Sequence, residues 1–188
     1  MKILGIAGSL RQKSYNRALL KSAVKLLPEG SIIDLFDLTD IPLYNEDLTQ
    51  KDLPAAVTRW RNALANTQAL LISSPEYNYS IPGVLKNALD WAATNSLGNL
   101  LANKHVGIMG ASPGSWGTTR AQLHLRQVLH AANAVVVARP EIFVRKASQV
   151  FDENGVLTDE KTSALLSQLL VNLITITSVE ESSIRLSN

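Results

Sequence analysis

The chain has 188 residues, of which 46% are hydrophobic, so it can bury one substantial core but is short for two full domains. We therefore expect residues 1–188 to form a single domain. Charged residues make up 18% of the sequence and the formal net charge is +2. This balance predicts neither a nucleic-acid-binding protein nor a charged tail, because both need a strong excess of one sign.

The absence of cysteine excludes disulfides, thiolate metal ligands and cysteine nucleophiles. His105, His124 and His130 lack the spacing of a metal site, and no metal is expected. No stretch approaches the roughly 18 uncharged apolar residues of a membrane span, and the opening MKILGIAGSLR lacks the apolar core of a signal peptide. These features favour a cytoplasmic location without a membrane partner.

Short apolar runs alternate with segments of helical period along the chain. The runs predict strands at residues 2–7, 31–36, 69–74, 105–110 and 134–138. They do not alternate with polar residues, which is typical of parallel strands covered by helices on both faces. Helices are expected at residues 15–27, 55–66, 84–93, 118–132 and 163–175. The polar tail, residues 179–188, is expected to be loosely held.

The repeating order of strand and then helix predicts a doubly wound α/β sandwich with five parallel strands rather than an eight-stranded barrel. In such sheets, ligands bind beyond the carboxyl ends of the strands, near the point where the strand order reverses. The loops that follow the first, third and fourth strands are therefore the places to look for a site.

The first strand runs into GSLRQKSYNRALL, residues 8–20, which is neither a GxGxxG segment nor a P-loop. A helix begins within it, and the first turn of a helix offers free N–H groups and a partial positive charge to a phosphate. The alternative is that Ser14 simply caps the helix and that the cations are solvated. The polar and cationic side chains of this segment are Ser9, Arg11, Lys13, Ser14, Asn16 and Arg17.

The third strand runs into PEYNYSIPGVLKNALDW, residues 75–91. Pro75 stiffens the chain as it leaves the strand. Aromatic faces, backbone amides and an Asn amide are the groups that a flat heterocycle with donors and acceptors requires. The alternative is that Tyr77 and Tyr79 only cover the end of the following helix. Trp91, within that helix, is expected in the core.

The fourth strand runs into GASPGSWGTTRAQ, residues 110–122. Its glycines and hydroxyl residues allow the backbone to approach a ligand closely, although a flexible surface loop would have the same composition. All three loops would open at one edge of the sheet. Together they predict a mononucleotide site, with one loop for the phosphate and two for a flat ring.

With these three segments in this order and spacing, the sequence resembles the NADPH-dependent FMN reductase family over residues 3–173. The resemblance implies a flavodoxin-like fold with strand order 2-1-3-4-5, FMN as cofactor and NAD(P)H as co-substrate. It implies ping-pong hydride transfer from NAD(P)H to FMN and then to a quinone, azo, metal-oxyanion or flavin acceptor. Because the family commonly forms dimers or tetramers, a homodimer or homotetramer is also implied.

The resemblance also implies which residues hold the cofactor. The FMN phosphate is expected at Ser9, Arg11, Ser14, Tyr15 and Asn16. The ring and ribityl chain are expected at Pro75, Glu76, Tyr77, Asn78, Ser112, Pro113, Gly114 and Gly117, with Arg120 in the same motif. No catalytic side chain is expected, because the flavin carries the chemistry. Trp116 departs from the family's usual pattern and is expected to alter the mouth of the site.

Two other functions are compatible with a flavin-binding domain. One is an electron carrier that binds FMN without being reduced by nicotinamide, although such carriers tend to be strongly acidic and this chain has a pI near 8.9. The other is a flavin-binding regulatory protein.

Overall fold

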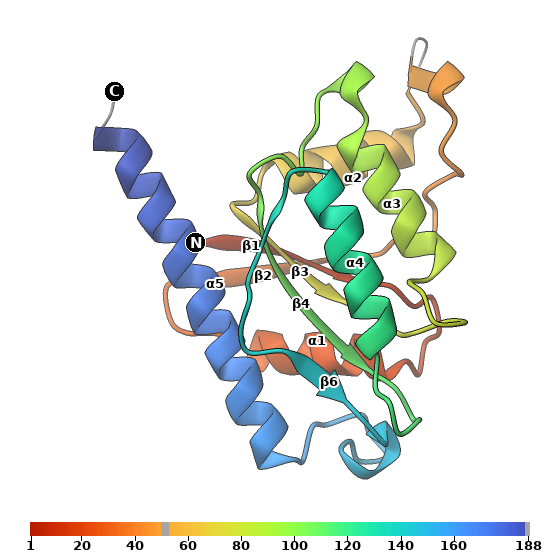
Figure 1. The fold of residues 1–188 in the computed structure, drawn as a ribbon, viewed down its shortest axis with the longest axis vertical. Coiled ribbons are helices and arrows are strands. Elements are labelled where there is room, and N and C mark those ends of the chain that lie inside the picture. The colour runs from red at the N-terminus through yellow and green to blue at the C-terminus, as the bar shows by residue number, and fades with distance from the viewer. Residues whose placement is uncertain (50–52, 187–188) are drawn as a thin grey trace.

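A parallel sheet forms the centre of the protein in a computed structural model that describes residues 1–49 and 53–186, with side chains described as far as Val179 (Figure 1). The strand order is β2-β1-β3-β4-β5, and β6 also pairs with β4. The predicted fold class and strand order are confirmed. The strands are β1 (Lys2–Ala7), β2 (Ile32–Phe36), β3 (Ala69–Ser73), β4 (His105–Ala111), β5 (Val135–Val136) and β6 (Ile142–Val144).

The fifth position of the sheet differs from the expectation of one continuous strand at residues 134–138. β5 has only two residues, which pair with the start of β4, and β6 pairs with residues 109–111 at its end. The chain leaves the sheet between them, where Pro140 has no N–H group to donate to a ladder. β6 was not predicted, because a three-residue run is too short to recognise.

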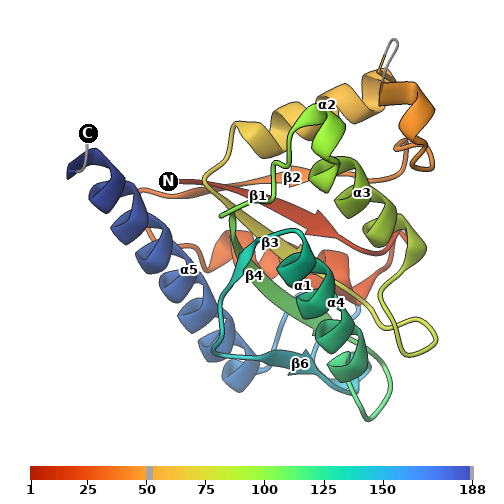
Figure 2. The same cartoon turned by 45° about the horizontal axis from the view of Figure 1, so that its top comes forward.

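Helices cover both faces of the sheet, with α1 and α5 on one side and α2, α3 and α4 on the other (Figure 2). Four of them begin and end within two residues of the predicted limits. Short 3-10 helices, η1 (Glu46–Thr49), η2 (Asn95–Leu97) and η3 (Ala147–Gln149), were not predicted. The α-helices are α1 (Tyr15–Lys25), α2 (Ala55–Ala65), α3 (Gly83–Ala93), α4 (Thr119–Ala131) and α5 (Glu160–Leu186).

The core has two halves, because successive strand residues point to opposite faces of the sheet. Leu4 and Ile6 of β1 belong to the half under α2, α3 and α4. Ile3 belongs to the half under α1 and α5. Trp91 is fully buried, as expected, and its indole N–H donates to the carbonyl oxygen of Pro42 at 2.8 Å.

The last helix is longer than predicted. It runs from Glu160 to Leu186, so residues 179–186 of the tail that was expected to be loosely held continue the helix, and the last two residues lie outside the described residues. The expectation that no stretch has the length and composition of a membrane span is also wrong, since Glu160–Val179 has a mean hydropathy of 1.5. Only part of this segment is buried, however: one side packs against the sheet, whereas Val171 and Val179 are exposed. The fully buried leucines are Leu166, Leu169, Leu170 and Leu173.

Candidate functional site

The loops after β1, β3 and β4 gather at one edge of the sheet, toward the lower right in both views of the fold (Figures 1 and 2). Backbone bonds align the strand ends from which they start. The Gly8 amide donates to the Ser73 carbonyl at 2.9 Å, and the Ser74 amide donates to the Met109 carbonyl at 3.0 Å. The three segments that the sequence marked out are therefore neighbours in space.

The loop after β1 leads into the N-terminus of α1. Ser14 caps this helix by accepting a hydrogen bond from the Asn16 amide at 3.2 Å, and the first-turn sequence YNRA contains no acidic residue. Arg11 is exposed and its guanidinium donates to the Lys13 carbonyl at 2.8 Å. Ser9 is buried. A neutral cap beside an exposed cation leaves the positive end of the helix dipole available to an anion.

Two other predicted phosphate residues have protein partners. The Tyr15 ring stacks on Phe151, with the ring centroids 5.7 Å apart. The Asn16 side chain is buried and bonds to the end of β4: its Nδ2 donates to the Ala111 carbonyl, and its Oδ1 accepts from the Ala111 amide, both at 2.9 Å. The structure thus directs the Asn16 amide group into the protein rather than toward the loop surface.

The loop after β3 is a tight turn. Tyr77 and Ser80 exchange backbone hydrogen bonds of 2.9 and 3.0 Å, and between them Asn78 and Tyr79 have positive φ angles of 50° and 68°. Two successive left-handed residues are typical of a type I′ turn. Pro75 at its start is buried, whereas the Tyr77 and Tyr79 side chains are exposed. The backbone of this loop is therefore held in one shape while its aromatic rings face solvent.

Glu76 joins this loop to the helix after β4. Its Oε2 accepts hydrogen bonds from the backbone amides of Arg120 at 2.9 Å and Ala121 at 3.1 Å, at the N-terminus of α4. Its Oε1 lies 3.5 Å from a guanidinium nitrogen of Arg120, and the Glu76 side chain is only 10% exposed. The carboxylate thus serves as an N-cap supplied by another segment. A cap of this kind was not apparent from the sequence, because the partners are 44 residues apart.

The loop after β4 approaches its neighbours closely at Gly110. A Cβ atom there would lie 2.1 Å from Thr118 Oγ1 and 2.5 Å from the Ser74 carbonyl oxygen, so only glycine fits. Ser112 is tied to β6, since its amide donates to the Val144 carbonyl at 3.0 Å. Gly117 has a positive φ of 66°.

Pro113 and Gly114 follow Ser112 and are exposed at the edge of the site. The Gly114 amide donates to Ser112 Oγ at 3.1 Å.

Aromatic and cationic side chains from two loops meet at the surface beside the site. The Arg120 guanidinium lies 4.2 Å from the centroid of the Tyr79 ring and 5.2 Å from that of Trp116. Trp116 is 67% exposed. The contact between the loops of Tyr79 and Trp116 through Arg120 was not predicted from the sequence.

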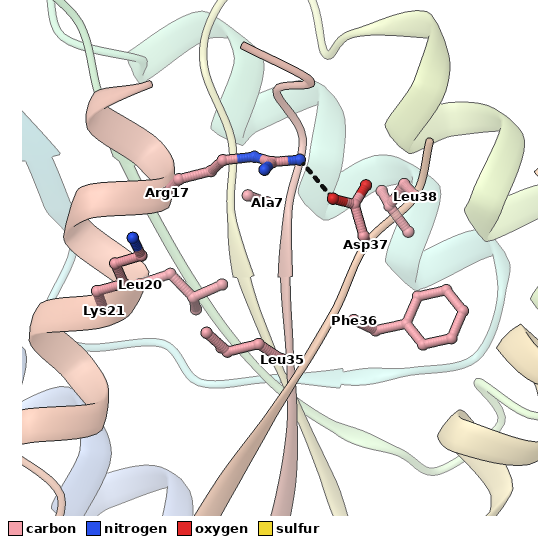
Figure 3. A pocket seen from close by; sticks show the side chains of 8 residues that line it. All are labelled: Ala7, Arg17, Leu20, Lys21, Leu35, Phe36, Asp37 and Leu38. Carbon is pink, nitrogen blue, oxygen red and sulfur yellow. Dashed lines mark hydrogen bonds and ion pairs between the residues drawn. The ribbon is translucent and has the colours of Figure 1, made fainter. Parts of the chain in front are cut away.

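A cavity of about 150 Å³ lies between α1 and the carboxyl ends of β1 and β2 (Figure 3). Across it, an Arg17 guanidinium nitrogen pairs with Asp37 Oδ2 at 2.7 Å, and Arg17 Nε donates to the Ser9 carbonyl at 3.1 Å. The pKa of the Asp37 carboxyl is lowered, chiefly by the hydrogen bond from the Thr39 hydroxyl and to a lesser extent by Arg17. Arg17 is therefore engaged by the protein, and the cavity flanks the three loops rather than lying between them.

The parallel sheet with this strand order, helices on both faces and three polar loops at one edge defines a flavodoxin-like protein. FerB from Paracoccus denitrificans, described as a flavoenzyme NAD(P)H:(acceptor) oxidoreductase, has a similar structure with a TM-score of 0.86 and 32% sequence identity. The match covers 94% of this chain and 97% of FerB.

Sequence comparison narrows this class. The model of the family NADPH-dependent FMN reductase matches residues 1–149. An NAD(P)H-dependent FMN reductase of Pseudomonas aeruginosa is 46% identical over 90% of this chain and 91% of its own length. A 2-hydroxy-1,4-benzoquinone reductase of a Burkholderia species is 36% identical over 90% of this chain and 92% of its own length. The chain belongs to the NADPH-dependent FMN reductase family and is an oxidoreductase, as the three motifs predicted.

Proposed function

We propose that the protein uses FMN to transfer electrons from NAD(P)H to a small-molecule acceptor, with residues 1–188 acting as one FMN-binding domain. The observation that carries this proposal is the N-terminus of α1, which has a neutral cap, no acidic residue in its first turn and Arg11 nearby. It opens at the same sheet edge as the two loops expected to contact the ring. This arrangement suits a ligand that has a phosphate at one end and a flat ring at the other.

The phosphate end would be held by Ser9, Arg11 and Ser14 together with the first amides of α1, including that of Tyr15. Ser14 already accepts from the Asn16 amide, and as a hydroxyl it still has a proton to donate. Arg11 adds a charge-assisted bond without having a carboxylate partner among the ion pairs of the described residues. Asn16 would contribute through its position in the helix.

The ring would lie between the segment from Pro75 to Asn78 and the segment from Ser112 to Gly117. The Tyr77 amide already donates to the Ser80 carbonyl, so we expect the ring to meet the amides of Glu76 and Asn78. Because the turn holds these amides in place, they would present fixed dipoles to negative charge on a reduced ring. FMN, when bound, supplies the two-electron chemistry, accepting a hydride and passing electrons to the second substrate.

The acceptor is proposed to be a quinone, with azo compounds, metal oxyanions and free flavin as further possibilities within the same ping-pong scheme. Relatives in bacteria and plants are named as quinone reductases, which supports a quinone over the other acceptors. The exposed Tyr77, Tyr79 and Trp116 would offer aromatic faces to such a planar compound. We further propose a cytoplasmic homodimer or homotetramer.

Anaerobic stopped-flow absorbance tests this function. Purified protein is expected to be yellow and to release FMN on denaturation, and NADPH or NADH should bleach the bound flavin rapidly. Adding a benzoquinone to the bleached protein should restore the colour. If neither nicotinamide bleaches the flavin, the protein is an FMN-binding carrier or regulator and the proposed activity is wrong.

A further inference from the structure

Asn16 makes more hydrogen bonds to the protein than a helix residue normally does. Among the predicted phosphate residues it is the most buried, with 2% of the residue exposed. Besides its pair of bonds with the Ala111 backbone, Oδ1 accepts from the Ser73 hydroxyl at 3.1 Å. The amide group thus uses both lone pairs of its oxygen and one of its two N–H groups within the protein.

The two partner residues, Ala111 and Ser73, lie at the ends of the two strands that lead into the proposed ring-binding loops. Ala111 immediately precedes Ser112, and Ser73 lies two residues before Pro75. Asn16 itself is the second residue of α1, whose N-terminus is the proposed phosphate site. Its amide pairs with Ala111 through one donor and one acceptor, as the backbone of an adjacent strand would. One side chain therefore connects all three loops.

We propose that Asn16 is a positioning residue that sets the distance between the phosphate end and the ring end of the site, rather than a contact to the phosphate. The inference rests on the proposed FMN site. Buried amide bonds of this kind are costly to leave unmade, so the loops keep their spacing in the absence of a ligand. A cofactor then meets a site that is already assembled, which saves the ordering that binding otherwise requires.

Riboflavin separates this role from a direct contact, because it carries the ring and ribityl chain of FMN but no phosphate. A residue that only touches the phosphate should matter for FMN and not for riboflavin. A residue that positions the ring walls should matter for both. Binding of each to flavin-free protein is measured by fluorescence quenching, with far-UV circular dichroism to check folding.

Asn16→Asp is the sharpest variant because its carboxyl group can be switched by pH. When protonated, it can donate to the Ala111 carbonyl and accept from the Ala111 amide, as the native amide does. When ionised, it has no donor and faces that carbonyl with a negative charge; burial and this repulsion favour the protonated form, whereas the positive end of the α1 dipole favours the ionised form. We expect riboflavin affinity to fall by roughly 5- to 100-fold at pH 8 and by a smaller factor at pH 5, where more of the carboxyl is protonated. Wild-type affinity for riboflavin should stay nearly constant over this range.

Two other variants complete the test. Ser73→Ala removes a single hydrogen-bond donor to Asn16 and should weaken the binding of riboflavin and of FMN by the same factor. This variant replaces Asn16→Asp in the test if Asn16→Asp does not fold. Arg11→Ala should weaken FMN and leave riboflavin unchanged. If Asn16→Asp and Ser73→Ala leave riboflavin affinity at the wild-type value, the positioning role is refuted. If the wild-type protein binds neither flavin, the proposed function fails together with this inference. If the wild-type protein binds both flavins and only the variants behave differently from expectation, the inference alone fails.

Discussion

The N-termini of α1 and α4 face the same edge of the sheet but are satisfied differently. At α4, the Glu76 carboxylate accepts from two backbone amides and lies close to Arg120. At α1, the cap is the neutral Ser14. Both ends carry the partial positive charge of a helix dipole. The protein neutralises the α4 end with its own carboxylate, whereas the cap and first turn of α1 carry no acidic side chain.

This difference indicates how the site divides its tasks. The occupied end of α4 fastens the loop after β3 to the loop after β4, and so holds together the two walls proposed for the ring. The end of α1 keeps its capacity to bind an anion. A phosphate would therefore bind at α1, although α4 follows a loop that is richer in glycine and hydroxyl residues.

The largest effect is expected where α4 begins. Gly110→Ala places a methyl group 2.1 Å from Oγ1 of Thr118, the residue before α4, and 2.5 Å from the Ser74 carbonyl. The free energy of unfolding should fall by about 3 kcal/mol or more, because neither neighbour can retreat from a packed core. Urea unfolding measures the change. Gly83→Ala is the matched control, since a Cβ there meets nothing within 4 Å, and equal stability of the two variants would contradict the close approach.

Arg11→Ala tests the end of α1. Loss of a charge-assisted bond to the phosphate should weaken FMN binding by about one to two orders of magnitude, equivalent to roughly 1.5–3 kcal/mol. Isothermal titration of flavin-free protein measures the affinity. Lys13→Ala is the control, because the Lys13 carbonyl that accepts from Arg11 is kept. Unchanged FMN affinity in Arg11→Ala would remove this residue from the site.

Glu76→Ala tests the end of α4. Two backbone amides lose their acceptor, so we expect the free energy of unfolding to fall by about 1–2 kcal/mol and FMN to bind more weakly. Glu76→Gln should lose less, because its amide oxygen can still accept from both. Asp90→Ala removes an acid from an exposed i,i+4 pair with Lys86 and should leave FMN affinity unchanged. If Glu76→Ala and Asp90→Ala behave alike, the carboxylate does not hold the walls together.

The smallest effect is expected at Asp37, which forms an ion pair with Arg17 of α1. Its pKa is lowered in the folded state, chiefly by the Thr39 hydroxyl. A lowered pKa stabilises the folded protein above the unfolded value near 3.9, and this stabilisation is lost as the pH falls through the folded pKa. Asp37→Asn should therefore cost less than about 1 kcal/mol at pH 7, since the pair is partly exposed, and almost nothing near pH 2. Thermal unfolding at both pH values shows whether the difference disappears in acid.

Local patterns were sufficient to predict the class of fold and the three loops. Apolar runs of strand length and segments of helical period recur along the chain, and each reports only on its own few residues. Four helices and the first four strands accordingly lie close to their predicted limits. The fifth strand was predicted less well, because whether residues near 140 pair with β4 depends on a strand 30 residues earlier.

The amino-acid sequence by itself determined the alternation of strands and helices, the polar loops that end three of the strands, and the family to which the chain belongs. Only the tertiary structure decided where the polar side chains point. Asn16 reaches Ala111, 95 residues away, and Glu76 reaches α4 across 44 residues. No local pattern encodes such partners, because these bonds form only when parallel strands bring distant loops to one edge of the sheet. For this reason the hydrogen bonds of Asn16 and Glu76 to distant segments could be found only in the fold.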